Sequence, residues 1–182
     1  RRGAGATVVQ RVLDYPIGPR TRFTESLRAA GREPSRRILV RETAGARRDE
    51  AEALGLAPGE PVHCAETLSH ADGVPVALSR TVWPAARLPG FLERLEAEGS
   101  VTAAFAACGV ADYARAWTRL TAERAGVLLA RHLGAPDGLP VLRSEALSVD
   151  VEGRPVEYGL TWFHTDRMPL MVEGRPEEAA RR

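Results

Sequence analysis

Arg115 is the residue of this chain whose type and setting best suit the binding of an anion. It lies between Tyr113 and Trp117 in a stretch with the pattern of a β-strand, and because side chains alternate along a strand, all three are expected on one face. A guanidinium is planar and donates two parallel hydrogen bonds to a phosphate, a phosphonate or a carboxylate. The alternative is a solvated arginine with both aromatic residues in the core. Arg80, on another predicted strand, is a second candidate for the same chemistry.

A carboxylate and an aromatic ring are expected to share the face of a later strand. Residues 155–164 alternate so that Glu157, Gly159, Thr161 and Phe163 point the same way. Glu157 is therefore a candidate for a polar pocket. A structural salt bridge from its carboxylate to an arginine is the alternative.

The sequence offers no recognisable catalytic or metal-binding arrangement. Cys64 and Cys108 occur singly, without a C-x-x-C motif, and are interpreted as reduced, buried thiols, with a disulfide or a redox sensor as the alternatives. The histidines are scattered along the chain, and no arrangement of a histidine base with a serine or cysteine nucleophile can be recognised from the sequence. We therefore expect no catalytic residue, no metal and no cofactor.

The charge balance argues against nucleic-acid binding by this segment itself. All 25 basic residues are arginine, and 24 acidic residues leave a net charge of +1. Binding of a phosphate backbone normally uses a strongly basic surface. No apolar run approaches the roughly 20 residues that a membrane helix needs, and no secretory signal is recognisable. A soluble, cytoplasmic protein is expected.

The elements that must position these residues belong to a duplicated unit. Residues 130–141, ARHLGAPDGLPV, resemble residues 51–62, AEALGLAPGEPV. The two copies are about eighty residues apart, and the unit occurs only twice in the chain. Each copy has the pattern strand, helix, strand, turn, strand. This predicts an α+β fold with a mainly antiparallel sheet of about six strands and flanking helices. The concave seam between the two copies is the expected place for a ligand.

Local signals give approximate bounds for the elements. Thr24 is expected to cap the first helix and Thr121 the last, while an Asp-Gly pair at residues 72–73 is expected to form a tight hairpin turn. The predicted helices are 24–30, 47–54, 88–107 with a break near Gly99, and 121–133; the predicted strands are 37–43, 62–70, 74–83, 113–120, 141–149 and 155–164.

Several ordered motifs resemble one family of effector-binding domains. The motifs are Leu54-Gly55-Leu56, Gly59-Glu60-Pro61-Val62, Ala71-Asp72-Gly73-Val74-Pro75, Leu88-Pro89-Gly90, Pro155-Val156-Glu157-Tyr158-Gly159 and Asp166-Arg167. They resemble the UTRA domain of bacterial GntR-superfamily transcription regulators of the HutC subfamily, a fold shared with chorismate lyase. Residues 1–18 are then expected to be a linker with the remnant of a winged-helix wing, 19–173 the UTRA domain and 174–182 a polar tail.

A finer resemblance is to the phosphonate-metabolism (PhnF-type) branch. It rests on residues 15–23, on Glu66-Thr67-Leu68 and on Asp112-Tyr113-Ala114-Arg115. That branch represses genes for the uptake and breakdown of phosphorus compounds, so the resemblance implies a small anionic effector related to phosphonate or phosphate.

The resemblance also implies a set of ligand-binding residues. In relatives that sense sugar phosphates, a loop corresponding to Arg22, Phe23 and Thr24 supplies backbone donors to the phosphate; an ordinary helix start is the alternative. Those relatives carry two arginines where this chain has Thr67 and Ser69, so a phosphosugar is a less expected effector here.

The family's later residues suggest the other end of the pocket. The resemblance implies that Glu157 accepts a hydrogen bond from a ligand hydroxyl or amine and that Phe163 packs on the ligand. Asp166 and Arg167 are expected to hold the end of the sheet together rather than to bind ligand.

Three functions remain open from the sequence. The first is the effector-sensing and homodimerising part of a repressor, which would bind operator DNA through an N-terminal winged helix that this chain does not contain. The second is a chorismate lyase-like enzyme acting on a small carboxylate. The third is a ligand-independent dimerisation module, which would be favoured by a seam filled with side chains. A wing-like segment at residues 3–9 favours the regulator over the enzyme.

Overall fold

The computed structural model describes residues 14–18, 20 and 22–172. The wing-like segment 3–9 and the tail 174–182 lie outside these residues. The elements are β1 (Tyr15–Pro16), α1 (Phe23–Ala29), β2 (Pro34–Gly45), α2 (Arg48–Leu54), β3 (Pro61–Ala71), β4 (Val74–Pro84), α3 (Phe91–Glu98), α4 (Val101–Ala107), β5 (Tyr113–Arg124), α5 (Val127–Leu133), β6 (Pro140–Asp150), β7 (Pro155–His164) and β8 (Leu170–Met171).

The main sheet confirms the predicted α+β class and the duplication. Its six strands are antiparallel in the order β2-β3-β4-β7-β6-β5. The first copy supplies β2, α2, β3 and β4, and the second supplies β5, α5, β6 and β7. The last strands of the two copies, β4 and β7, pair with each other, from Ala77 opposite Phe163 to Val82 opposite Tyr158. The seam between the copies is therefore the centre of the sheet, and β2 and β5 are its edges.

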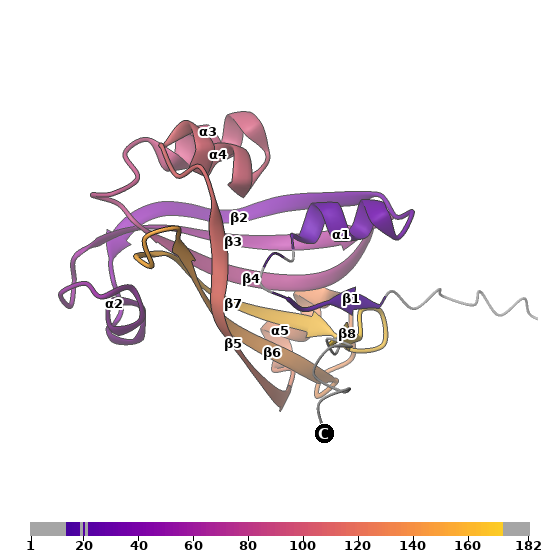
Figure 1. Cartoon of the computed structure of the whole chain (residues 1–182). Helices are drawn as coiled ribbons and strands as arrows, with labels where there is room; N and C mark the ends of the chain where they lie inside the picture. The colour runs from indigo at the N-terminus through magenta and orange to yellow at the C-terminus, as the bar shows by residue number, and fades with distance from the viewer. Residues whose placement is uncertain (1–13, 19, 21, 173–182) are drawn as a thin grey trace, which may run out of the picture.

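The sheet is strongly bent, and different helices cover its two faces (Figure 1). Helices α2 and α5, the equivalent helices of the two copies, pack on one face through Ala51, Leu54, Ala130 and Leu133. Helices α1, α3 and α4 lie on the other face, and the N-terminal α1 runs alongside β2 (Figure 1). Two layers of helices thus enclose one curved sheet.

Glycine and the hairpin turn define element ends as expected. Gly55 and Gly134 adopt left-handed conformations (φ 69° and 58°) at the ends of α2 and α5. Asp72 and Gly73 have φ of 51° and 78°, the positive pair that a two-residue hairpin needs. The Asp72 carboxylate also accepts a hydrogen bond from the Glu33 backbone N–H at 2.8 Å, which fixes the turn against the start of β2.

The expected caps at Thr24 and Thr121 are both wrong. Helix α1 already begins at Phe23, so Thr24 lies inside its first turn and Arg22 is the N-cap residue, without a side-chain cap. Thr121 lies in β5, which pairs with β6 as far as Arg124, and α5 begins only after Gly126. The ladder with β6 overrides the local helix signal, and the β-branched Thr121 suits a strand.

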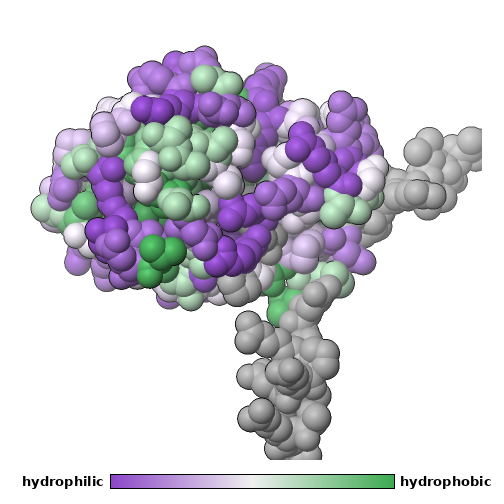
Figure 2. Space-filling view, turned by 45° about the horizontal axis from the view of Figure 1, so that its top comes forward, coloured by the Kyte–Doolittle hydropathy of each residue, from purple (hydrophilic) through white to green (hydrophobic). Residues whose placement is uncertain are grey.

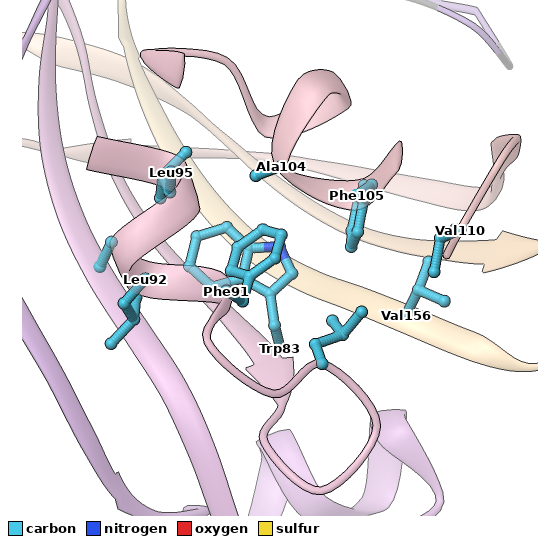
Figure 3. Packing of buried hydrophobic residues seen from close by; sticks show 10 residues of the cluster. Trp83, Phe91, Leu92, Leu95, Ala104, Phe105, Val110 and Val156 are labelled. Carbon is cyan, nitrogen blue, oxygen red and sulfur yellow. The ribbon is translucent and has the colours of Figure 1, made fainter. Parts of the chain in front are cut away.

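The largest aromatic cluster fixes α3 and α4 to the sheet (Figure 3). The Phe91 ring lies 4.7 Å from the Trp83 ring and 5.2 Å from the Phe105 ring, centroid to centroid. Phe91 and Phe105 are fully buried, and Val156 closes the cluster from β7. The break between α3 and α4 at Gly99 (φ 62°) and Ser100 lets both helices contribute to it.

A short second sheet completes the fold. Strands β1 and β8 pair in parallel over two residues each, a pairing too short to be predicted from periodicity.

None of the helices in the described part of the chain is long and apolar enough to cross a membrane. On the face shown in Figure 2 most of the surface is hydrophilic, and apolar side chains gather in one area bordered by hydrophilic ones.

Candidate functional site

A cavity of about 550 Å³ lies on the face of the sheet that α1, α3 and α4 cover. Its wall includes residues of β3 and β4 from the first copy and of β5, β6 and β7 from the second, so it spans the seam as expected. A cavity of this size suits a small organic ligand. The seam is therefore not filled with side chains.

Small hydroxyl side chains form much of the cavity wall on the sheet. They stand at alternate positions of four strands and so share one face: Thr67, Ser69, Ser79, Thr81, Ser144, Ser148 and Thr161. The Thr67 and Ser79 hydroxyls hydrogen-bond to each other at 2.7 Å across β3 and β4. Thr67 and Ser69, two of the residues that the resemblance suggested for the ligand, thus line the cavity. Hydroxyls can both donate and accept, which suits a polar ligand.

Glu157 provides the only described carboxylate on the central strands of this wall. Its Oε2 accepts a hydrogen bond from Trp83 Nε1 at 3.1 Å, and its Oε1 accepts one from Ser148 Oγ at 3.3 Å. Burial raises the pKa of Glu157 above its usual value, and the nearby Arg115 guanidinium and the Trp83 hydrogen bond oppose this only in part. Each carboxylate oxygen retains a lone pair that a ligand donor could use.

Arg115 lies in the cavity wall together with Tyr113, as expected. The Tyr113 hydroxyl hydrogen-bonds to Thr102 at 3.1 Å, and burial raises its pKa, so it remains a neutral hydroxyl. Within the described residues Arg115 forms no ion pair. Its side chain is half-buried and lines the cavity, so a cation without a direct ion pair in the described chain is presented there.

The start of α1 closes another side of the cavity. Arg22, Phe23 and Thr24 all line it. The Arg22 guanidinium lies 4.7 Å from the Tyr113 ring centroid and hydrogen-bonds to Thr102, so it ties α1 to α4 and β5. These contacts place Arg22 as a bridge across the cavity rim.

Phe163 lies at the α1 end of the same cavity. Its ring centroid lies 5.6 Å from that of Tyr15, and the Tyr15 and Phe23 rings are 6.1 Å apart. Gly159 and Thr161 line the cavity with Glu157 and Phe163, which is the shared face that alternation predicts.

Arg80 and Trp117, two of the expected ligand residues, lie elsewhere. Arg80 points to the opposite face, where its guanidinium pairs with Glu50 at 3.0 Å and Glu66 at 3.3 Å. Its neighbours Ser79 and Thr81 take the cavity face, so alternation itself directs Arg80 away from it.

A β-bulge displaces Trp117 from the face of Arg115. Arg115 lies opposite Ser148, but Trp117 lies opposite the next residue, Leu147, because Ala116 is an extra residue in β5. The Trp117 ring instead contacts the Tyr158 ring edge-on at 6.5 Å. The common face expected for the three residues therefore holds only for Tyr113 and Arg115.

Sequence reasoning missed Arg36 and Trp83 in the cavity wall. Arg36 precedes the strand predicted at 37–43, whereas β2 begins at Pro34. Extending the alternation backwards from Ile38, which also lines the cavity, would have placed Arg36 on the same face.

The remaining polar chemistry is structural. Burial raises the pKa of the Cys64 thiol to about 11, so it is an unreactive thiol at neutral pH.

The Arg167 guanidinium donates to the carbonyl oxygens of Pro75, Leu133 and Gly134 at 2.8, 2.6 and 3.0 Å, tying the end of β7 to its neighbours as expected. In the part of the chain that the structure describes, no group of three His, Cys, Asp or Glu residues could hold a metal ion.

Replacement of Glu157 tests the raised pKa of its carboxyl. When the pKa of a carboxyl is higher in the folded than in the unfolded state, the folded state is destabilised relative to the unfolded state as pH rises from the unfolded pKa towards the folded pKa. We expect Glu157→Gln to become more stable relative to the parent as pH rises from 4 to 7, measured by thermal melting. The exposed Glu52→Gln controls for the change of net charge. A constant difference between variant and parent would contradict the account.

Several known proteins that resemble this chain are transcription regulators. The UTRA domain profile matches residues 29–169. An uncharacterised HTH-type transcriptional regulator of Rhizobium meliloti (strain 1021) is 37% identical over 161 residues, 88% of this chain and 66% of that protein. The probable transcriptional regulator PhnF of Escherichia coli (strain K12) is 29% identical over 180 residues, 95% of this chain and 72% of that protein. The crystal structure of PhnF from Mycobacterium smegmatis matches with a TM-score of 0.83 and 26% identity, over 97% of this chain and 77% of that one.

The family match, the fold and the cavity together identify this chain as an effector-binding domain of a GntR-family transcription regulator. The chain belongs to the UTRA domain family, which confirms the resemblance of its motifs. It spans 66% of the length of the Rhizobium regulator.

Proposed function

We propose that this domain senses a small phosphorus-containing anion, a phosphonate or a phosphate-related metabolite, for a repressor of the PhnF type. The observation that carries the proposal is the Arg115 guanidinium in a hydroxyl-lined cavity, without an ion pair in the described chain. Arginine binds phosphate and phosphonate groups through paired hydrogen bonds. The relatives named PhnF, one of them printed as a transcriptional repressor, support the assignment to a repressor of this type.

In the full-length protein, the domain is proposed to act as a homodimer. Operator DNA would bind to an N-terminal winged helix outside these 182 residues, in keeping with the HTH-type relatives. An effector changes DNA binding only if it has different affinities for two conformations of the dimer. Closure of the α1 and α4 rim, joined by Arg22 and Thr102, would supply such a difference.

Arg115→Ala is expected to keep the fold and to weaken binding of a phosphorus anion at least about tenfold, because one charged hydrogen-bonding group is worth about 1.5–3 kcal/mol. The test is a thermal-shift screen against phosphate, alkylphosphonates, phosphosugars, urocanate and chorismate, since a ligand of the native state raises its melting temperature. Arg119→Ala is the control: Arg119 lies four residues along β5, with 66% of its side chain exposed. A variant that responds as the parent does would refute the assignment of Arg115.

The same screen separates the alternative functions. Stabilisation by chorismate, followed by its conversion, would favour the lyase-like enzyme, for which Glu157 beside Arg115 is the supporting observation. Stabilisation by urocanate or a phosphosugar alone would indicate another branch of sensors. No response to any compound would leave a dimerisation module or an effector outside this set.

A further inference from the structure

Arg36 lines the cavity from β2, the edge strand opposite that of Arg115, while the other arginines of the wall, Arg20, Arg22 and Arg28, lie in α1 or just before it. In the register of β2 and β3, Arg36 lies directly across from Ser69, so both share the cavity face. Its guanidinium lies 5.2 Å from the centroid of the Phe23 ring. The ring holds the arginine over the α1 end of the cavity and adds a cation–π interaction. A guanidinium is thus present beside Ser69, although β3 itself carries only hydroxyls there.

Neither Arg36 nor Arg115 is neutralised by an ion pair among the described residues. Glu157 is the carboxylate whose charge acts on Arg36, yet its two oxygens accept hydrogen bonds from Trp83 and Ser148. Arg36 remains exposed to water, but the surrounding protein desolvates its guanidinium enough to lower its pKa. Arg36 thus offers a cation at the cavity wall, without an ion pair in the described chain, with which a bound anion could pair.

The bend of the sheet brings these two edge-strand residues towards the same groups. Five strand spacings of about 4.8 Å would separate β2 from β5 by about 24 Å in a flat sheet. Yet Arg36 and Arg115 both act electrostatically on Tyr15 and on Glu157. Both guanidinium groups therefore lie within electrostatic range of the same two residues of the cavity that they line.

We propose that Arg36 and Arg115 bind one tetrahedral dianion from opposite sides of the cavity. The assignment rests on the proposed function and deepens it. Two guanidinium groups can donate more hydrogen bonds than the two oxygens of a carboxylate use well, whereas a phosphonate or phosphate group offers three oxygens and two charges. This favours a phosphonate or a phosphate monoester over a monocarboxylate.

The size of the cavity adds a second requirement on the ligand. About 550 Å³ exceeds what one tetrahedral ion fills, so room remains for an organic substituent. The free lone pairs of Glu157 and the hydroxyls of Thr161 and Ser144 line that room. The ligand class is thus a phosphonate or phosphate monoester whose substituent carries a hydrogen-bond donor.

The test is isothermal titration calorimetry of the chain with methylphosphonate, glycerol phosphate and acetate. Arg36→Gln is expected to weaken binding of the two phosphorus compounds at least about tenfold, as loss of one charged hydrogen-bonding group implies. Arg37→Gln is the matched control, because Arg37 lies opposite Leu68 on the other face of β2 and its loss changes net charge equally. Its affinity is expected to stay within about twofold of the parent.

Melting of the unliganded variants separates binding from structure. Because Arg36 has no ion pair in the described chain and its described ring contact is the cation–π interaction with Phe23, Arg36→Gln is expected to lose no more than about 1 kcal/mol of stability without ligand. A larger loss of stability would make Arg36 a structural residue and overturn the proposal. Unchanged affinity in Arg36→Gln with weakened affinity in Arg115→Gln would also overturn it while leaving the proposed function in place. Tighter binding of acetate than of methylphosphonate, or no binding of either phosphorus compound, would refute both.

Discussion

Phe91→Ala is expected to destabilise the domain by about 4 kcal/mol, the cost of truncating a fully buried aromatic residue and leaving a cavity. Phe91 is the centre of the cluster that fixes α3 and α4 to the sheet, with the rings of Trp83 and Phe105 at 4.7 and 5.2 Å. Urea denaturation followed by circular dichroism would measure the loss. Because Leu95 and Thr102 carry this helix pair into the cavity wall, the variant is also expected to bind effector more weakly.

The matched control for Phe91 is an exposed apolar residue. Leu128 in α5 is 73% exposed, and Leu128→Ala is expected to change stability by no more than about 0.5 kcal/mol. Similar losses in the two variants would mean that the aromatic cluster does not hold α3 and α4 as described.

Asp150→Asn is expected to cost about 3 kcal/mol at pH 7, because it breaks a buried charge cluster. The Asp150 side chain is 6% exposed, and its Oδ1 accepts from the backbone N–H groups of Glu152 and Arg154 at 2.9 Å. Its Oδ2 accepts from Arg154 and from Arg87, whose guanidinium also donates to the Pro155 carbonyl at 2.9 Å. This one carboxylate therefore holds the β6–β7 turn and the chain after β4 together.

The loss from Asp150→Asn is also expected to depend on pH. Burial alone would raise the pKa of Asp150, but hydrogen bonds from the Arg154 backbone and from the Arg154 and Arg87 side chains outweigh it and hold the pKa well below its usual range. Such a group stabilises the fold above its unfolded pKa of about 4, and this contribution is lost as pH falls below that value.

Denaturation at pH 7 and pH 3 tests this dependence. The gap between Asp150→Asn and the parent is expected to narrow at the lower pH. The exposed Asp137→Asn, in the turn before β6, is the control and is expected to show little effect at either pH. A gap that is equal at the two pH values would contradict the role of the Asp150 charge.

The repeat made most of the fold predictable. Two copies of one pattern, each with a helix that ends at glycine, predict six antiparallel strands. In the structure the copies meet where β4 pairs with β7, for example at Val82 opposite Tyr158. The pattern could not predict where a strand overrides a helix signal. At Thr121 the decision depends on pairing with Arg143, which is 22 residues away and invisible to local propensity.

The site was predictable only where alternation holds. Thr67, Ser69 and Glu157 follow it, and they line the cavity as expected. Trp117 does not, because one bulged residue moves it to the other face, and a bulge leaves no clear mark in a sequence. Arg36 needed a strand to begin three residues earlier than predicted.

The most direct test of the central claim uses the three tryptophans as reporters in an NMR titration with methylphosphonate and glycerol phosphate. The Trp83 indole N–H donates to Glu157 in the cavity wall, whereas the Trp162 indole donates to Glu123 at 2.6 Å and Trp117 packs on Tyr158, both away from the cavity. If the cavity binds the effector, the indole signal of Trp83 moves with ligand concentration while the other two stay in place. A shift of Trp117 or Trp162 with Trp83 unchanged would place the anion elsewhere and contradict the account.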